Sequence, residues 1–147
     1  VCSSDLAQLE KLDYIVESRR RNFKILREGL EGTEGLILPE PIKNSDPSWF
    51  GFLISVKSDA GFTRNQLSEY LESKKIQTRN LFAGNLVKHP AFDEMRSTGK
   101  GFRIVGELKN TDFVMTNTFW IGVYPGMTEK MLQYMISTIK EFVASHK

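Results

Sequence analysis

The chain has 147 residues, is 40% hydrophobic and carries a net charge of +2, which predicts one globular domain with its own core. So small a charge gives no reason to expect nucleic acid or a membrane as a partner, and no apolar run is long enough to span a bilayer. The single cysteine, Cys2, excludes an internal disulfide, and we expect a cytoplasmic protein. Two distant histidines, His89 and His146, complete no metal-ligand set.

The first predicted element is a long amphipathic helix. Asp5 and Gln8 have the spacing of a cap pair, and Gly32 is expected to end the helix. The run Arg19–Arg21 is expected to form a solvent-exposed face, with docking against a partner as the alternative. The apolar positions of the stripe are Leu9, Leu12, Val16, Phe23, Leu26 and Leu30.

Residues 35–57 predict a short strand, a proline-rich turn and a longer strand. Strand alternation places Trp49 on the face opposite Phe50. Core packing is the expected role of both rings, and lining a cleft is the alternative. The residues expected to share the face of Phe50 are Phe52, Ile54 and Val56.

The second helix has the best-defined start, because Thr63 and Gln66 have capping-box spacing and Phe62 with Leu67 has that of a hydrophobic staple. We then expect a short strand at 76–78, a short capped helical turn at 110–117 and a strand at 118–124. The last helix is expected to begin at Thr128. Its predicted core positions are Met131, Leu132, Met135, Ile136, Ile139, Phe142 and Val143. This order of elements predicts an α+β domain, with a small, mostly antiparallel sheet and helices on one side.

Several segments together resemble one family of proteins. They are "LAQLEKLD", "ILPEPIKNSDPSWFGFLI", "FTRNQL", "TRNLFAGNLVKHPAF" and "NTDFVMTNTFWIGVYPGMT". The chain is identified from them as similar to the pyridoxal-phosphate-dependent sugar aminotransferases and dehydrases of the DegT/StrS type. Within that family it most resembles the branch of 3-dehydrases that act on CDP-4-keto-6-deoxy-D-glucose in lipopolysaccharide synthesis.

The resemblance implies the C-terminal small domain of a fold-type I enzyme, covering residues 6–147 with the interdomain helix, after an unmatched junction at 1–5. The enzyme would use pyridoxamine or pyridoxal phosphate, and a 2Fe-2S cluster, to remove the 3-hydroxyl of a CDP-4-keto-6-deoxyhexose in O-antigen synthesis. Its implied partners are an N-terminal large domain, a second subunit in a homodimer, and a flavin- and iron–sulfur-containing reductase. The cofactor, cluster and catalytic residues are expected outside this chain, which alone would be inactive.

The stretch from 78 to 90 is the candidate substrate loop. Residues 74–109 carry eight basic and three acidic side chains, and a basic loop with glycine, amides and an aromatic ring suits a nucleotide diphosphate. A solvated connector is the alternative interpretation. Within this loop the resemblance implies that Arg79 binds a phosphate or a substrate oxygen. It implies substrate contact also at Phe82, Gly84, Asn85, Lys88 and His89.

Two other functions stay open. A nucleotide-sugar aminotransferase of the same family would differ at the upstream cofactor position, where a lysine replaces the histidine of the dehydrases. The isolated chain could also be a non-catalytic binding or docking module. The "LFAGN" and "FWIGVYPG" segments favour the dehydrase.

Overall fold

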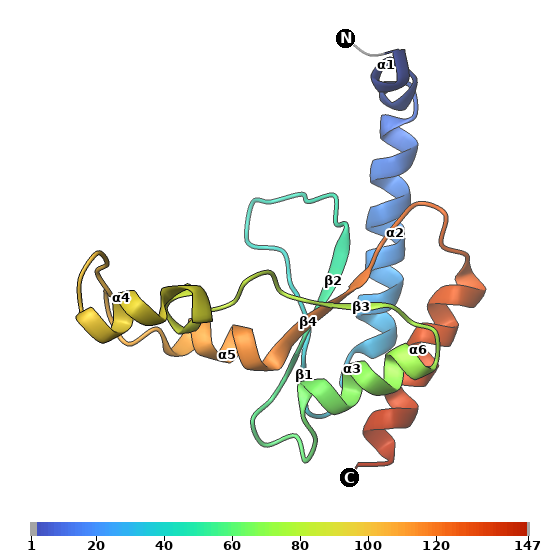
Figure 1. The fold of residues 1–147 in the computed structure, drawn as a ribbon. Coiled ribbons are helices and arrows are strands. Elements are labelled where there is room, and N and C mark those ends of the chain that lie inside the picture. The colour runs from blue at the N-terminus through green and yellow to red at the C-terminus, as the bar shows by residue number, and fades with distance from the viewer. Residues whose placement is uncertain (1–2, 147) are drawn as a thin grey trace.

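A computed structural model describes the backbone of residues 3–146 and the side chains of residues 6–146 (Figure 1). Cys2, to which the sequence assigned no role, lies outside the described residues. The helix α1 runs from Ser3 to Leu9, so Asp5 lies inside it and the predicted cap pair with Gln8 is wrong.

The predicted long first helix is two helices. A turn at Glu10 and Lys11 separates α1 from α2 (Leu12–Leu30), and only the second half of α2 enters the core. Leu9 and Leu12 are exposed, because this end of the helix extends beyond the sheet (Figure 1). The stripe residues that are buried are Phe23, Leu26 and Leu30.

The sheet has four antiparallel strands in the order β1-β2-β4-β3. They are β1 (Leu36–Ile37), β2 (Gly51–Val56), β3 (Thr78–Asn80) and β4 (Thr118–Gly122). The strand predicted at 76–78 therefore begins two residues later. Ile76 is not in the ladder because its amide N–H donates to the carbonyl of Leu71 at the end of the preceding helix.

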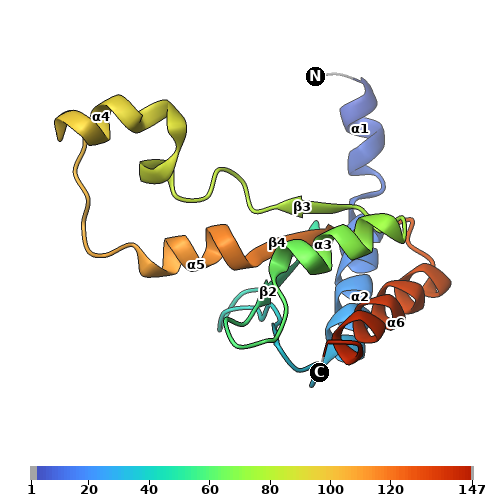
Figure 2. The same ribbon diagram turned by 60° about the horizontal axis from the view of Figure 1, so that its bottom comes forward.

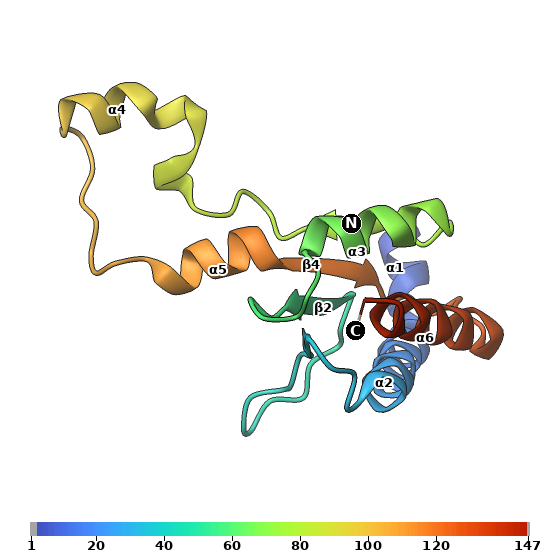
Figure 3. The same ribbon diagram turned by 90° about the horizontal axis from the view of Figure 1, so that it is seen from below.

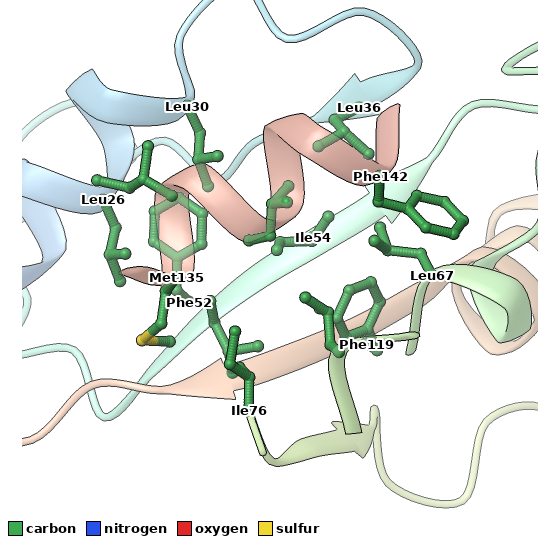
Figure 4. Packing of buried hydrophobic residues seen from close by; sticks show 14 of the residues in the cluster. Leu26, Leu30, Leu36, Phe52, Ile54, Leu67, Ile76, Phe119, Met135 and Phe142 are labelled. Carbon is green, nitrogen blue, oxygen red and sulfur yellow. The ribbon is translucent and has the colours of Figure 1, made fainter. Parts of the chain in front are cut away.

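Three helices cover one face of the sheet, which confirms the predicted α+β class. They are α2, α3 (Arg64–Ser73) and α6 (Glu129–Ala144), which lie on the right in Figure 3, at the end of the molecule opposite α4. Phe52, Ile54 and Phe119 lie on the covered face and are fully buried (Figure 4). Leu67 and Phe142 pack on them from the helices.

The aromatic residues before β2 depart from simple alternation. Trp49 stacks on Phe23 with ring centroids 4.3 Å apart, so core packing is confirmed for Trp49. Phe50 is 56% exposed and packs edge-on against Trp120 on the other face, so its predicted place in the core is wrong. The regular strand begins only at Gly51, and alternation therefore does not apply upstream of it.

The two predicted helix starts are confirmed. Thr63 and Gln66 form the reciprocal capping box of α3, and the Thr128 side chain accepts the amide N–H of Met131 at the start of α6. One core position of α6 was wrong, since Met131 is 40% exposed. Capping fixes the direction of each helix at its first turn, which orients the apolar faces toward the sheet.

Between β3 and β4 the chain leaves the body as an arm, defined here as residues 81–117 (Figure 2). The arm contains the short 3-10 helices Leu86–Lys88 and Pro90–Phe92, then α4 (Asp93–Thr98) and α5 (Lys109–Asn117). The turn predicted at 110–117 is thus a longer helix. It is preceded by Leu108 in a left-handed conformation and has no side-chain cap.

Candidate functional site

Arg79 lies on the sheet face that the helices leave open. It pairs with Trp120 across β3 and β4, and its guanidinium carbon lies 5.8 Å from the centre of the Trp120 ring. No acidic side chain pairs with Arg79 anywhere in residues 6–146. A guanidinium held over an aromatic face keeps its hydrogen-bond donors available for an anion.

Phe82 is the most exposed large hydrophobic side chain of the loop. It is 81% exposed and has a φ of 48°, a left-handed value that is uncommon for residues other than glycine. Its amide N–H donates to the carbonyl of Asn80 at 2.9 Å, which holds the turn. A strained backbone that presents an apolar ring to solvent is a feature found at binding sites.

Gly84 and Asn85 connect the loop to α5 rather than leaving it free. Gly84 has a φ of 66°, and a Cβ at this position would overlap the side chain of Met115. Asn85 is only 4% exposed. Its Nδ2 donates to Oδ1 of Asp112 at 2.7 Å, and its Oδ1 accepts the amide N–H of Val87 at 3.1 Å.

Lys88 converges on the same carboxylate as Asn85. Its Nζ lies 2.8 Å from Oδ2 of Asp112. These two hydrogen bonds, from Lys88 first and Asn85 second, lower the pKa of Asp112 from its ordinary value of 3.8. Sequence reasoning missed Asp112, because its partners Asn85 and Lys88 lie 27 and 24 residues away and no local pattern marks the contact.

His89 stands apart from this anchor. Its ring is exposed and has no hydrogen-bond partner among the described residues, while its backbone carbonyl accepts from Arg96 at 2.9 Å. Arg96 also donates to the carbonyl of Val87 and pairs with Asp93. The six predicted site residues therefore share one loop, but only Arg79, Phe82 and His89 present exposed side chains that make no hydrogen bond or ion pair within residues 6–146.

Two side chains that the sequence did not single out hold the base of the arm. Arg64 donates to the Asn80 side chain and, at 3.5 Å, to the carbonyl of Met115, so it links β3 to α5. Glu72 accepts from the backbone N–H and the hydroxyl of Thr78, which lowers the pKa of Glu72 from its ordinary value of 4.5. Both ends of β3 are therefore held, Thr78 by Glu72 and Asn80 by Arg64, and this fixes the direction in which the loop leaves the sheet.

Two cavities lie near the loop. One, of about 160 Å³, is apolar and lies inside the arm between Leu86, Phe92 and Phe102. The other, of about 540 Å³, lies at the edge of the sheet and includes Arg79 and Trp120 in its lining. No cluster of three or more metal-ligating side chains occurs in the part of the chain that the structure describes. Within the same part, no helix is long and apolar enough to cross a membrane.

Comparison with known proteins places these features in context. Residues 2–140 match the profile of the DegT/DnrJ/EryC1/StrS aminotransferase family. The chain is 51% identical over 139 residues to a dTDP-4-dehydro-2,6-dideoxy-D-glucose 3-dehydratase of Saccharopolyspora spinosa, covering 95% of this chain and 29% of that protein. It is 49% identical over 138 residues to the lipopolysaccharide biosynthesis protein RfbH of Salmonella typhimurium, covering 93% of this chain and 30% of that protein.

The fold is also found in solved structures. The Escherichia coli GDP-4-keto-6-deoxy-D-mannose-3-dehydratase with bound hydrated PLP superposes with a TM-score of 0.77 at 23% identity, covering 91% of this chain and 33% of that one. At this identity the likeness concerns the fold alone. The chain therefore spans about a third of the length of the relatives that it matches.

Proposed function

Because this chain belongs to the DegT/DnrJ/EryC1/StrS aminotransferase family, we propose that it is the C-terminal, substrate-side part of a nucleotide-sugar 3-dehydratase. The whole protein would remove the 3-hydroxyl of a CDP-4-keto-6-deoxyhexose in dideoxysugar and O-antigen synthesis. The observation that carries this proposal is the 51% identity to a sugar 3-dehydratase across 95% of the chain.

Within this proposal the six loop residues have two kinds of role. Arg79 binds a phosphate or sugar oxygen, Phe82 forms an apolar wall and His89 borders the sugar. These three side chains are exposed and make no hydrogen bond or ion pair within residues 6–146. Asn85 and Lys88 keep the loop in place through Asp112, and Gly84 allows the close approach of Met115. The chain thus binds and orients the substrate.

The cofactor would be bound elsewhere in the whole protein. Pyridoxal phosphate in enzymes pairs its ring nitrogen with a fixed side chain, commonly a carboxylate, and forms a Schiff base with a lysine or faces a base at that position. The larger cavity has lysines but no acidic residue in its lining, so it does not fit this group. When bound by the rest of the protein, the cofactor supplies the electron sink for loss of the 3-hydroxyl. A large N-terminal domain, a homodimeric partner, a 2Fe-2S cluster and an electron-donating reductase complete the proposed assembly.

A chimeric protein tests this function. The matching segment of the Saccharopolyspora dehydratase is replaced with residues 6–147 of this chain, and loss of the 3-hydroxyl is followed by mass spectrometry of the nucleotide sugar. We expect the chimera to keep dehydratase activity and Arg79→Ala to lower its kcat/KM at least about 10-fold, the loss typical of one charge-assisted contact.

Lys24→Ala is the matched control, because Lys24 is an exposed cation on α2 that pairs with Glu28 one turn further along the helix. It should leave kcat/KM unchanged. If Arg79→Ala and Lys24→Ala change kcat/KM by the same factor, the 78–90 loop is a connector and not a substrate loop. If the chimera transfers an amino group from a donor instead of removing the hydroxyl, the aminotransferase alternative is correct.

A further inference from the structure

The smaller cavity gives the arm an open apolar face. Its walls come from the 3-10 helices, α4 and the α4–α5 connection, and they include Leu86, Phe92, Met95 and Phe102. The space between them is about 160 Å³. An apolar cavity of about 150 Å³ holds a molecule of benzene, so this one has room for a leucine side chain. Val105, further along the same connection, is also apolar and is 71% exposed.

The α4–α5 connection is held against α4 at its start. Gly99 ends α4 with a φ of 66°. Gly101, with a φ of 84°, comes so close to α4 that a Cβ there would lie 2.9 Å from Cε of Met95. Residues 102–105 are exposed, and their backbone makes no hydrogen bond within the described residues 3–146. Exposed apolar side chains gathered on one surface in this way mark a site of interaction with another protein.

The same connection carries positive charge that nothing on the arm neutralises. Three of the five basic side chains in residues 81–117 form ion pairs with acidic side chains of the arm. Lys100 and Arg103, on either side of Phe102, form none within residues 6–146. The acidic side chain of the arm that stays unpaired within the same residues is Glu94.

The N-terminal helices have an apolar surface of the opposite charge. Residues 6–17 carry three acidic side chains and one basic one, all exposed and all without an ion pair within residues 6–146. The acidic ones are Glu10, Asp13 and Glu17, and the basic one is Lys11. The exposed apolar side chains among them are Leu6, Leu9, Leu12 and Tyr14.

These two surfaces lie too far apart to meet within one chain. In Figure 1 α1 stands at the top of the molecule and α4 lies at its left end, and Figure 3 separates them as well. Their chemistry nevertheless matches, because both are apolar and their unpaired charges are opposite; even the minority charges, Glu94 and Lys11, have opposite signs. A helix whose apolar side chains enter a groove, with complementary charges around it, is a common mode of recognition. A second copy of the chain supplies the matching surface.

We propose that the arm of one copy of this chain binds the N-terminal helices of a second copy. A leucine of α1 enters the cavity of the arm, and Lys100 and Arg103 face Glu10 and Asp13. Two copies that each contribute an arm and a pair of helices close the contact into a dimer with twofold symmetry. Only residues of this chain form the contact, so it is independent of the proposed dehydratase function and of any N-terminal large domain.

Charge reversal on each surface tests this pairing. Lys100→Glu with Arg103→Glu makes the arm acidic, and Glu10→Lys with Asp13→Lys makes the helices basic. Analytical ultracentrifugation of each double variant alone should give a dissociation constant at least 10-fold higher than that of the unmodified chain, because like charges then face each other. An equimolar mixture of the two variants should associate again, since acidic arms meet basic helices. Unchanged association of the arm variant, or a mixture that associates no better than its components, would overturn the proposal.

The matched control reverses two cations on α6. Lys130 and Lys140 are exposed and form no ion pair within residues 6–146, so Lys130→Glu with Lys140→Glu changes the net charge by the same amount as the arm variant. The control should leave the dissociation constant unchanged, and an equal weakening in the control and the arm variant would also overturn the proposal. All the replaced side chains are exposed, so circular dichroism should show folded protein in every variant. The chimera assay measures the dehydratase assignment separately, so the two can fail independently.

Discussion

The side-chain amide of Asn85 donates to Oδ1 of Asp112 at 2.7 Å, across 27 residues of sequence. This contact joins the start of the arm to α5, near its return to the sheet. Lys88 occupies the other oxygen of the same carboxylate. The shape of the candidate loop therefore depends on one acidic residue that is not in the loop.

Replacement of Asn85 tests this anchor. Asn85→Ala should destabilise the chain by about 1–3 kcal/mol, because it removes a buried partner of Asp112 and of the Val87 amide. Hydrogen exchange at Val87 should become faster in the same variant. Asn65→Ala, on the exposed side of α3, is the control and should change stability by less than about 0.5 kcal/mol. Equal effects in the two variants would contradict the anchor.

The anchor should also weaken in acid. The pKa of Asp112 is lowered in the folded chain from 3.8, so the ionised carboxylate is favoured by folding. Its contribution is fully present above pH 3.8 and is lost as the pH falls below 3.8 through the lowered folded value. Hydrogen exchange of residues 82–89, measured from pH 6 down to pH 2 and corrected for intrinsic rates, should show this loss. Asp112→Asn should abolish the pH dependence in these residues; if it persists, another group such as Glu72 is responsible.

Gly84 and Gly99 form a matched pair for a test of the close contact with Met115. Both have a φ of 66°, but a Cβ at Gly84 would overlap Met115, whereas a Cβ at Gly99 would meet nothing within 4 Å. Gly99→Ala should therefore cost only the left-handed strain of about 1–2 kcal/mol. Gly84→Ala should cost about 1–3 kcal/mol more through overpacking. Denaturant unfolding measures both, and Met115→Ala in the Gly84→Ala background should recover part of the difference.

The projecting N-terminal helices should make the isolated chain self-associate. Leu6, Leu9, Leu12 and Tyr14 are all exposed on α1 and the first turn of α2. A group of apolar side chains exposed in this way favours association. Light scattering should show a mass that rises with concentration, and Leu6→Glu with Leu9→Glu should return it to that of a monomer. A constant monomer mass for the unmodified chain at high concentration would contradict this expectation.

Much of the fold could be predicted from local patterns. The capping residues Thr63 and Gln66 placed the start of α3, and the alternation of Phe52, Ile54 and Val56 placed the buried face of β2. Such patterns work because each depends on residues within a few positions of one another. They failed at Phe50, where a bend before the strand decided the exposure of the side chain. They also failed at Met131, which lies at the edge of the core.

The candidate site could be predicted only as a stretch of chain. The sequence placed Arg79 and Phe82 in the loop with Asn85 and Lys88, and the family resemblance gave the loop a substrate. It could not separate outward-facing side chains from those held internally, because the partner Asp112 comes from a distant helix.

The sequence by itself determined the class of fold, the starts of α3 and α6, and the family, because these depend on local chemistry and on motifs read in order. Tertiary structure alone decided that Asn85 and Lys88 meet Asp112, and that Lys75, Arg79 and Trp120 line one cavity. The reason is physical. The return of the arm brings Asn85 and Lys88 to Asp112, and the separation of β3 from β4 leaves the cavity that Lys75, Arg79 and Trp120 line. No periodicity along the chain encodes either arrangement.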